Sequence, residues 1–304
     1  MPDTPPAEVA VDEHLVRSLL QDQHPDLADL PLQRMSSGWD NTVWRLGTDL
    51  AVRLPRRAVA ARLVEHEQRW LPELAVLVAP VSDVLLPVPV RVGEPTARYP
   101  WRWSVVPWVP GRSAGTVPAE ARRSLADPLA RFLRAVHVAA PPHAPANPVR
   151  GVPLRDRDAT VRQRLAGGTV PRAEEAAALW ADLVATPPWA GPPTWLHGDL
   201  PPHNLVVSQD GVLAAVVDFG DLTAGDPATD LATAWLTFDA AGRARFRAAL
   251  AGRYDDATWR RARGWALSMA TAMVTMSDDE PVVRAIGHHA LAEVLAADDP
   301  PDHG

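Results

Sequence analysis

The apolar positions in the first third of the chain switch between a helical period and the two-residue period of strands. Residues 11–23 place leucines on one side of a short predicted helix. Two alternating runs follow, TVWRL at 42–46 and LAVRL at 50–54, and the Gly-Thr-Asp turn between them predicts a β-hairpin. Residues 57–74 return to the helical period, which predicts a second helix.

A Pro- and Gly-rich break then separates a β-rich part from a helical part. VPVRVG at 88–93 and WRWSVVPWV at 101–109 predict strands, and PGRSAG at 110–115 ends the pattern. Helical patterns follow at 125–136, 155–166, 172–186, 240–252, 256–275 and 281–296. One further β-hairpin interrupts them, with strands NLVV at 204–207 and VLAAVVDF at 212–219.

This order of elements predicts an α+β protein with two lobes. A β-rich N-terminal lobe spans residues 1–106, a hinge spans 107–115, and a mostly helical C-terminal lobe spans 116–304. Clefts between lobes are common ligand sites, so we expect the functional residues to lie between the two.

Composition narrows the class of protein. The formal charge of −7 disfavours a nucleic-acid partner, because phosphate contacts require a basic surface. No apolar run approaches the ~18–20 residues of a membrane span, and the acidic, Pro-rich N-terminus lacks the pattern of a signal peptide. With a cysteine count of 0, there is no thiolate metal site. We therefore expect a cytoplasmic protein without a membrane partner.

Basic residues are restricted to one type. The chain contains no lysine, so all 30 residues of the Lys-plus-Arg total are arginines. Chemistry that needs a fixed cation therefore has to use arginine or histidine.

Three polar side chains flank the second predicted hairpin. Asp199 and Asn204 precede its first strand, and Asp218 lies near the end of its second. A hairpin returns its ends to one place, so the three should converge. Two carboxylates and an amide oxygen suit Mg²⁺ that is shared with substrate phosphates. The order Asp-x-x-x-x-Asn and then Asp-Phe-Gly is typical of phosphoryl transfer. The alternative is structural: a helix or turn cap, a turn residue and a strand end.

Around these residues the chain resembles the aminoglycoside phosphotransferase family, small-molecule kinases with a protein-kinase-like fold. The resemblance rests on HGDLPPHNLVV at 197–207 and VVDFGDLTAGDPATDLATAW at 216–235. It extends to SSGWDNTVWRLGTDLAVRLPRR at 36–57 and EHEQRWLPEL at 65–74. It departs at Pro201, where the family usually has His.

The resemblance implies a role for each residue of the two motifs. Asp199 would be the catalytic base, Asn204 and Asp218 would hold Mg²⁺, and ATP or GTP would be the phosphate donor. His197 would be structural, with its ring bonded to backbone near the metal motif. The remaining expectations are a solvated His203, and Asp226 and Asp230 holding the loop after the metal motif and starting the next helix.

The nucleotide site should also involve the N-terminal lobe. Kinases place a Lys on the third strand, paired with a Glu of the following helix, and the matching residue here is Arg53. Its planar fork can bind phosphate oxygens and a carboxylate. The helical phase favours Glu67 as partner over Glu65, and a surface position for Arg53 is the alternative.

Two short segments complete the predicted nucleotide site. Ser36 and Ser37 precede the first strand of the N-terminal hairpin, where they could contact phosphates, although an ordinary turn is the alternative. VVPWVPG at 105–111 matches the interlobe hinge, which pairs with the purine through backbone. Since Pro107 has no N–H, Trp108 or Val109 has to donate.

The leading hypothesis is a phosphotransferase that moves the γ-phosphate of ATP or GTP to a hydroxyl of a small molecule, above all an aminoglycoside or another antibiotic. A kinase of a metabolite alcohol, such as an amino alcohol or a sugar, would use the same residues. A non-catalytic nucleotide-binding protein of kinase-like fold is the third hypothesis, suggested by Arg53. Candidates for binding a cationic aminoglycoside are Asp156, Asp158, Asp278, Asp279 and Glu280.

Overall fold

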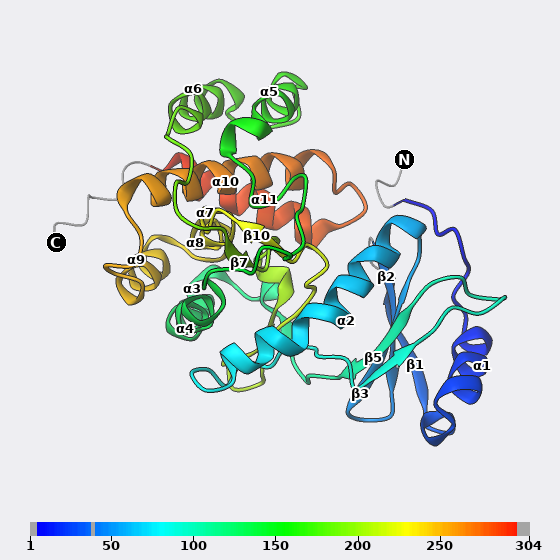
Figure 1. Ribbon diagram of the computed structural model, residues 1–304. Coiled ribbons are helices and arrows are strands. Elements are labelled where there is room, and N and C mark those ends of the chain that lie inside the picture. The colour runs from blue at the N-terminus through cyan, green and yellow to red at the C-terminus, as the bar shows by residue number, and fades with distance from the viewer. Residues whose placement is uncertain (1–4, 38–39, 297–304) are drawn as a thin grey trace.

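The structure is a computed structural model that describes residues 5–37 and 40–296, without the side chains of residues 36 and 37. A β-sheet lobe at the N-terminal end joins a helical lobe at the C-terminal end (Figure 1), which confirms the predicted α+β class. No helix within the described residues is both long enough and apolar enough to cross a membrane.

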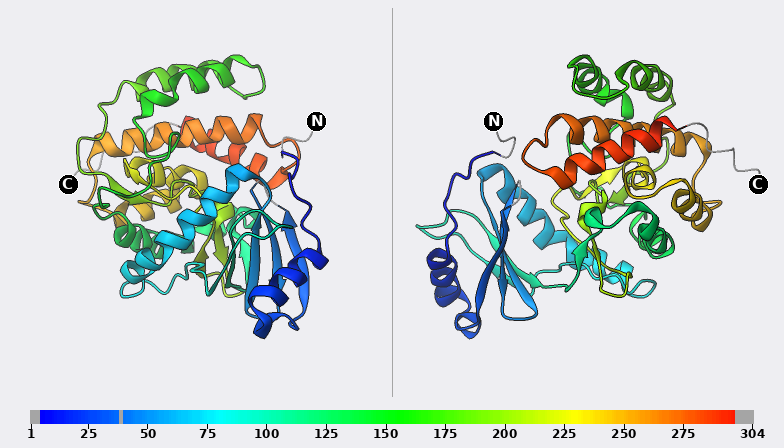
Figure 2. Two further views of the ribbon diagram at one scale, coloured as in Figure 1. Left: turned by 45° about the vertical axis from the view of Figure 1, so that its right-hand side comes forward. Right: turned by 180° about the vertical axis from the view of Figure 1, so that it is seen from behind.

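The N-terminal lobe is a five-stranded antiparallel sheet with one helix on each face (Figures 1 and 2). Its strands lie in the order β1-β2-β3-β5-β4. Their bounds are β1 (Leu32–Ser37), β2 (Asn41–Leu46), β3 (Leu50–Pro55), β4 (Arg91–Gly93) and β5 (Trp103–Pro107). Helix α1 (Glu13–Gln23) covers one face and α2 (Ala58–Val78) the other. The two-residue period of β3 places Val52 and Leu54 in the core with α1, and so directs Arg53 toward α2.

The predicted elements of this lobe are mostly confirmed. The hairpin is β2–β3, and Gly47 takes a φ of +62° in its turn. Strand β1 was not predicted, because LQRMSS has few apolar residues to mark an edge strand. The strand predicted at 88–93 is reduced to β4, since the prolines before it cannot join a ladder.

Helix α2 ties the two lobes together. Its C-terminal half contributes Trp70, Leu71 and Leu74 to the core cluster that the C-terminal helices build. Its N-terminal half lies over the sheet, where Glu67 is buried.

The chain crosses between the lobes after β5. Strand β6 (Arg112–Ser113) pairs with β8 (Leu205–Val207), which pairs with β9 (Leu213–Val216). A second small sheet pairs β7 (Thr194–Leu196) with β10 (Thr223–Gly225). The prediction of a single β interruption was therefore wrong, because strands of two or three residues show no alternation. The lobe boundaries at 107–115 stay a prediction.

The helices predicted for the C-terminal lobe are present as α4 (Ala126–Val136), α5 (Asp158–Ala166), α6 (Ala173–Val184), α9 (Ala240–Ala249), α10 (Asp256–Thr275) and α11 (Pro281–Leu295). Further short helices are α3 (Ala119–Arg122), α7 (Ala228–Leu231) and α8 (Thr233–Thr237). Helices α5, α6, α7, α8 and α11 pack against α10. Most residues of α10 are buried, and α5 and α6 lie on its outer side (Figures 1 and 2).

Candidate active site

The segment after β7 forms a tight loop that carries Asp199. Gly198 has a φ of +88°, and a Cβ there would lie 2.2 Å from the backbone oxygen of Asp221, so only glycine fits. The 3-10 helix η5 (Pro202–Asn204) follows and leads directly into β8. The amide nitrogen of Asn204 donates to the backbone oxygen of Asp199 at 3.0 Å, which fixes the spacing of the two residues.

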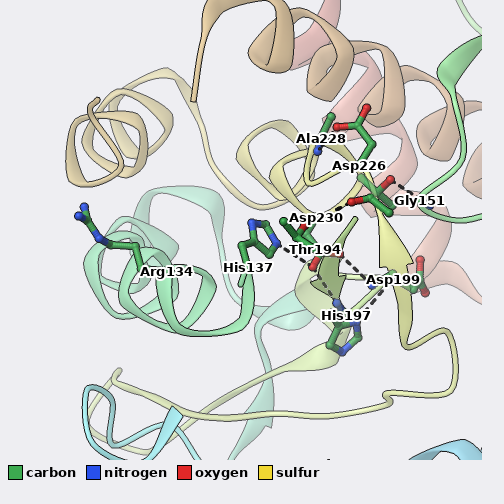
Figure 3. Close-up of polar contacts among 12 residues, drawn as sticks. Arg134, His137, Gly151, Thr194, His197, Asp199, Asp226, Ala228 and Asp230 are labelled. Carbon is green, nitrogen blue, oxygen red and sulfur yellow. Dashed lines mark hydrogen bonds and ion pairs between the residues drawn. The ribbon is translucent and has the colours of Figure 1, made fainter. Parts of the chain in front are cut away.

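Asp230 holds this loop through hydrogen bonds to its backbone. Its carboxylate accepts hydrogen bonds from the backbone N–H groups of His197 at 2.7 Å and Gly198 at 2.8 Å. The ring of His137 contacts the same carboxylate at 3.1 Å (Figure 3). Burial alone would raise the pKa of Asp230, but the bond with His137 and the loop N–H groups more than offset it and lower the pKa. The expectation that Asp230 holds the loop after the metal motif was therefore wrong, because the carboxylate points at the loop before it.

Two other predicted structural residues, His197 and Asp226, make the expected kind of contact, whereas His203 does not lie where it was predicted. Nε2 of His197 contacts the backbone oxygen of Val217 at 3.0 Å, which confirms its predicted bond near the metal motif. Asp226 accepts from the N–H of Ala228 at 3.0 Å at the start of α7, and it also binds Arg261 at 2.7 Å. His203 is half-buried and lines the interlobe cavity, so its predicted solvated position was wrong; η5 turns it inward.

The two expected metal ligands lie at the same cavity. Val217 donates its N–H to the backbone oxygen of Asn204 at 2.9 Å, which brings Asp218 beside Asn204. Asp218 takes a φ of +63°, a conformation that costs free energy and that concentrates at functional sites. The described residues contain no cluster of three His, Cys, Asp or Glu side chains that could cage a metal. One carboxylate and one amide oxygen nevertheless fit Mg²⁺ whose coordination is completed by water and phosphates.

Arg53 lies between α2 and the metal ligands. Its Nη1 donates to both carboxylate oxygens of Glu67, at 3.0 and 2.9 Å, and its Nη2 lies 3.6 Å from Oδ1 of Asp218. The structure thus pairs Arg53 with Glu67 and not with Glu65. Burial alone would lower the pKa of Arg53, but the two carboxylates more than offset it and raise the pKa. Arg53 is therefore a fixed cation at the edge of the cavity and not a surface arginine.

A cavity of about 440 Å³ opens between the lobes. Val43 and Ala51 line it from the sheet, and the hinge lines it through Trp108 and Val109. The N–H of Trp108 already donates to the backbone oxygen of Asp49 at 2.7 Å, so of the two predicted hinge donors Val109 is the one left for the expected purine.

The phosphate contacts of Ser36 and Ser37 stay a prediction. Their backbone ends β1 beside β2, and their side chains lie outside the described part of the chain.

Arg150 is a site residue that the sequence did not reveal. Its Nη2 donates to Oδ1 of Asp199 at 3.0 Å, and its Nε donates to Asp221 at 3.2 Å. Asn147 fixes the arginine, since its amide oxygen accepts from the N–H of Arg150 at 3.1 Å and its amide nitrogen binds Asp221 at 2.8 Å. Burial raises the pKa of Asp199, and the charge of Arg150 opposes that rise. The side chains of Asp199 and Arg150 are each 23% exposed, so a small molecule can reach them.

Comparisons with known proteins identify the family and the fold. The model of the phosphotransferase enzyme family (APH) matches residues 31–265. A similar solved structure is the GDP complex of wild-type aminoglycoside 2'-phosphotransferase-IIIa, with 18% identity, a TM-score of 0.68, and coverage of 94% of this chain and 99% of that chain. The streptomycin-ATP-APH(2")-IIa ternary complex has 15% identity, a TM-score of 0.59, and coverage of 91% and 95%.

A third similar structure is the macrolide 2'-phosphotransferase type I, with 18% identity, a TM-score of 0.61, and coverage of 97% of this chain and 100% of that chain. At such identities these likenesses show the fold alone. No curated protein sequence matches this chain significantly.

Proposed function

This chain belongs to the phosphotransferase enzyme family, and we propose that it transfers the γ-phosphate of ATP or GTP to a hydroxyl group of a small molecule. The observation that carries the proposal is that Asn204 and Asp218 line a cavity of nucleotide size, while the side chain of Asn204 is bonded to the backbone of Asp199 at 3.0 Å. Arg53, anchored by Glu67, supplies a cation at the same place.

Each residue has a distinct part in the proposed reaction. Asp199 orients the acceptor hydroxyl and takes its proton. The hydroxyl oxygen forms a bond to the γ-phosphorus while the bond from that phosphorus to the β-phosphate oxygen breaks. Asn204 and Asp218 would hold Mg²⁺, which when bound neutralises charge on the phosphate oxygens. Arg53 binds donor phosphates, and Arg150 places its charge beside Asp199, where negative charge develops on the transferred group.

An antibiotic is the first acceptor to consider, because one similar structure contains streptomycin and another is named a macrolide phosphotransferase. The acidic residues that were expected to bind a cationic aminoglycoside do not support that acceptor, because two of them are already paired. Asp158 accepts from Arg162 and Trp180, and Asp278 is paired with Arg284. A metabolite alcohol is therefore the second candidate. A cytoplasmic location stays a prediction of the sequence.

The test is a transfer assay with γ-labelled ATP and GTP in Mg²⁺ against kanamycin, streptomycin, erythromycin and a set of sugars, amino alcohols and hydroxy acids. Label in one of these acceptors is the expected result. Nucleotide binding without transfer to any of them would support the non-catalytic alternative. Absence of nucleotide binding would contradict the whole proposal.

A further inference from the structure

Three arginines, Arg150, Arg157 and Arg164, recur at intervals of seven residues in the helical lobe. Arg150 contacts Asp199 directly. Arg157 ends the 3-10 helix η4 (Leu154–Arg157), and Arg164 lies on α5, which follows without a break. Seven residues are about two helical turns, so Arg157 and Arg164 lie on the same side of this segment. Each of the two is half-buried.

These arginines differ in how their charges are balanced. Asp199 and Asp221 compensate Arg150. Arg157 has no hydrogen-bond or ion-pair partner within the described residues, and its Nε is buried. Among the residues that the structure describes, Arg164 reaches only the backbone oxygen of Ser268 at 3.4 Å and the sulfur of Met276 at 3.6 Å. Arg157 and Arg164 are therefore two cations that no carboxylate of the described residues pairs with.

The cost of this arrangement shows in the pKa values. Burial lowers the pKa of Arg157, and the charge of Arg150 lowers it further. Burial likewise lowers the pKa of Arg164, with Arg157 and Arg150 adding to the effect. A half-buried arginine that is influenced by other cations and by no carboxylate is unfavourable until an anion joins it. Because Arg150 acts on both arginines and also contacts Asp199, this uncompensated charge points to a ligand near the candidate base.

The nucleotide does not account for the two unpaired arginines. Neither Arg157 nor Arg164 is among the residues that line the nucleotide cavity. Arg157 ends η4 and Arg164 lies on α5, both in the helical lobe, and Arg150, which contacts Asp199, precedes them in the chain. They are therefore placed for the acceptor and not for the donor.

We propose that Arg157, assisted by Arg164, binds an anionic group of the acceptor while the acceptor's hydroxyl lies at Asp199. A guanidinium fork binds a carboxylate or a phosphate through two parallel hydrogen bonds, so either group fits. The acceptor class is then a hydroxy acid or a phosphorylated alcohol, and not a polycationic aminoglycoside. This inference rests on the proposed function, because Asp199 marks the acceptor position only if phosphoryl transfer occurs there.

The first test measures anion binding by the full chain saturated with Mg²⁺ and a non-hydrolysable ATP analogue, so that the donor phosphate positions are filled. Inorganic phosphate and acetate are titrated separately against chloride at equal ionic strength, by calorimetry and by the shift in unfolding temperature. Arg157→Gln should weaken binding of the preferred anion about tenfold or more, the loss of a charge-assisted hydrogen bond. Arg155→Gln, in the exposed part of the same helix η4, is the matched control and should bind as the wild type does.

Stability separates a ligand site from a structural role. Without phosphate or acetate, Arg157→Gln should unfold at the wild-type temperature or above it, because the change removes an unpaired cation. A clear fall in unfolding temperature would show that Arg157 supports the fold. If the analogue binds and neither phosphate nor acetate does, the inference is overturned. It is also overturned if Arg157→Gln and Arg155→Gln bind the anion equally well.

The second test compares acceptors by charge. Transfer from ATP is measured with glycerate, glycerol 3-phosphate, glycerol and kanamycin, for the wild type and Arg157→Gln. The wild type should prefer an anionic acceptor over glycerol, and Arg157→Gln should abolish the preference. Efficient kanamycin transfer that Arg157→Gln leaves unchanged or increases refutes the inference and leaves the proposed function standing. Failure to bind the ATP analogue instead refutes the proposed function.

Discussion

Replacing Arg53 tests what an arginine does where related kinases use lysine. Arg53 is 9% exposed and its partner Glu67 is 3% exposed, so Arg53→Gln leaves a carboxylate buried without its cation. Breaking one side of a buried ion pair costs about 3–5 kcal/mol. At about 2 °C per kcal/mol for a large domain, the unfolding temperature should fall by about 6–10 °C.

The same change should weaken the nucleotide. Nη1 of Arg53 is occupied by both oxygens of Glu67, whereas Nη2 lies at the cavity, 3.6 Å from Asp218. Loss of one charge-assisted hydrogen bond to a phosphate costs about 1.5–3 kcal/mol, which is about 10- to 100-fold in affinity. Calorimetric titration with Mg²⁺ and a non-hydrolysable ATP analogue measures this loss.

A double variant separates the two roles of Arg53. Arg53→Gln/Glu67→Gln leaves neither partner of this buried pair charged, so it should regain most of the lost unfolding temperature. Its nucleotide affinity should stay as low as that of the single variant, because no cation faces the phosphates. Recovery of wild-type affinity by the double variant would refute the reasoning and reduce Arg53 to a brace for α2.

Three further changes probe the other site residues. Asp218→Ala should make the measured nucleotide affinity independent of Mg²⁺; a retained Mg²⁺ dependence would place the metal elsewhere. Arg150→Gln should shift the acidic limb of the pH profile of kcat/KM to higher pH, because burial raises the pKa of Asp199 and the opposing charge is lost; an unshifted limb would contradict the contact. Asp230→Asn should lower kcat more than nucleotide affinity in steady-state and binding assays, since an amide cannot accept from both His197 and Gly198 N–H groups; equal losses would point to general unfolding.

The local part of the site was predictable from the sequence. Asp199, Asn204 and Asp218 flank one hairpin, and hairpin geometry alone required them to meet. The pairing of Arg53 with Glu67 was predicted by the resemblance to kinases together with the helical phase of residues 57–74. Both predictions rest on patterns within a short stretch of chain.

The parts of the site and fold that the sequence did not predict depend on contacts between distant segments, which no local sequence pattern indicates. Arg150 comes from an irregular, Pro-rich segment 49 residues before Asp199, and nothing in its surroundings distinguishes it from the other arginines. His203 was expected to be solvated, because its position in the motif says nothing about the side to which η5 turns it. Strands β7 and β10 are too short to show a period.

The central claim is that Asp199 is the base of a phosphoryl transfer. The direct measurement is the transfer of the γ-phosphate of labelled ATP to the acceptor identified by the panel assay, in the wild type and in Asp199→Asn. Transfer should fall by about 10²- to 10⁴-fold while the affinity for Mg²⁺ and the ATP analogue stays at the wild-type value. Transfer at the wild-type rate by Asp199→Asn would contradict the claim.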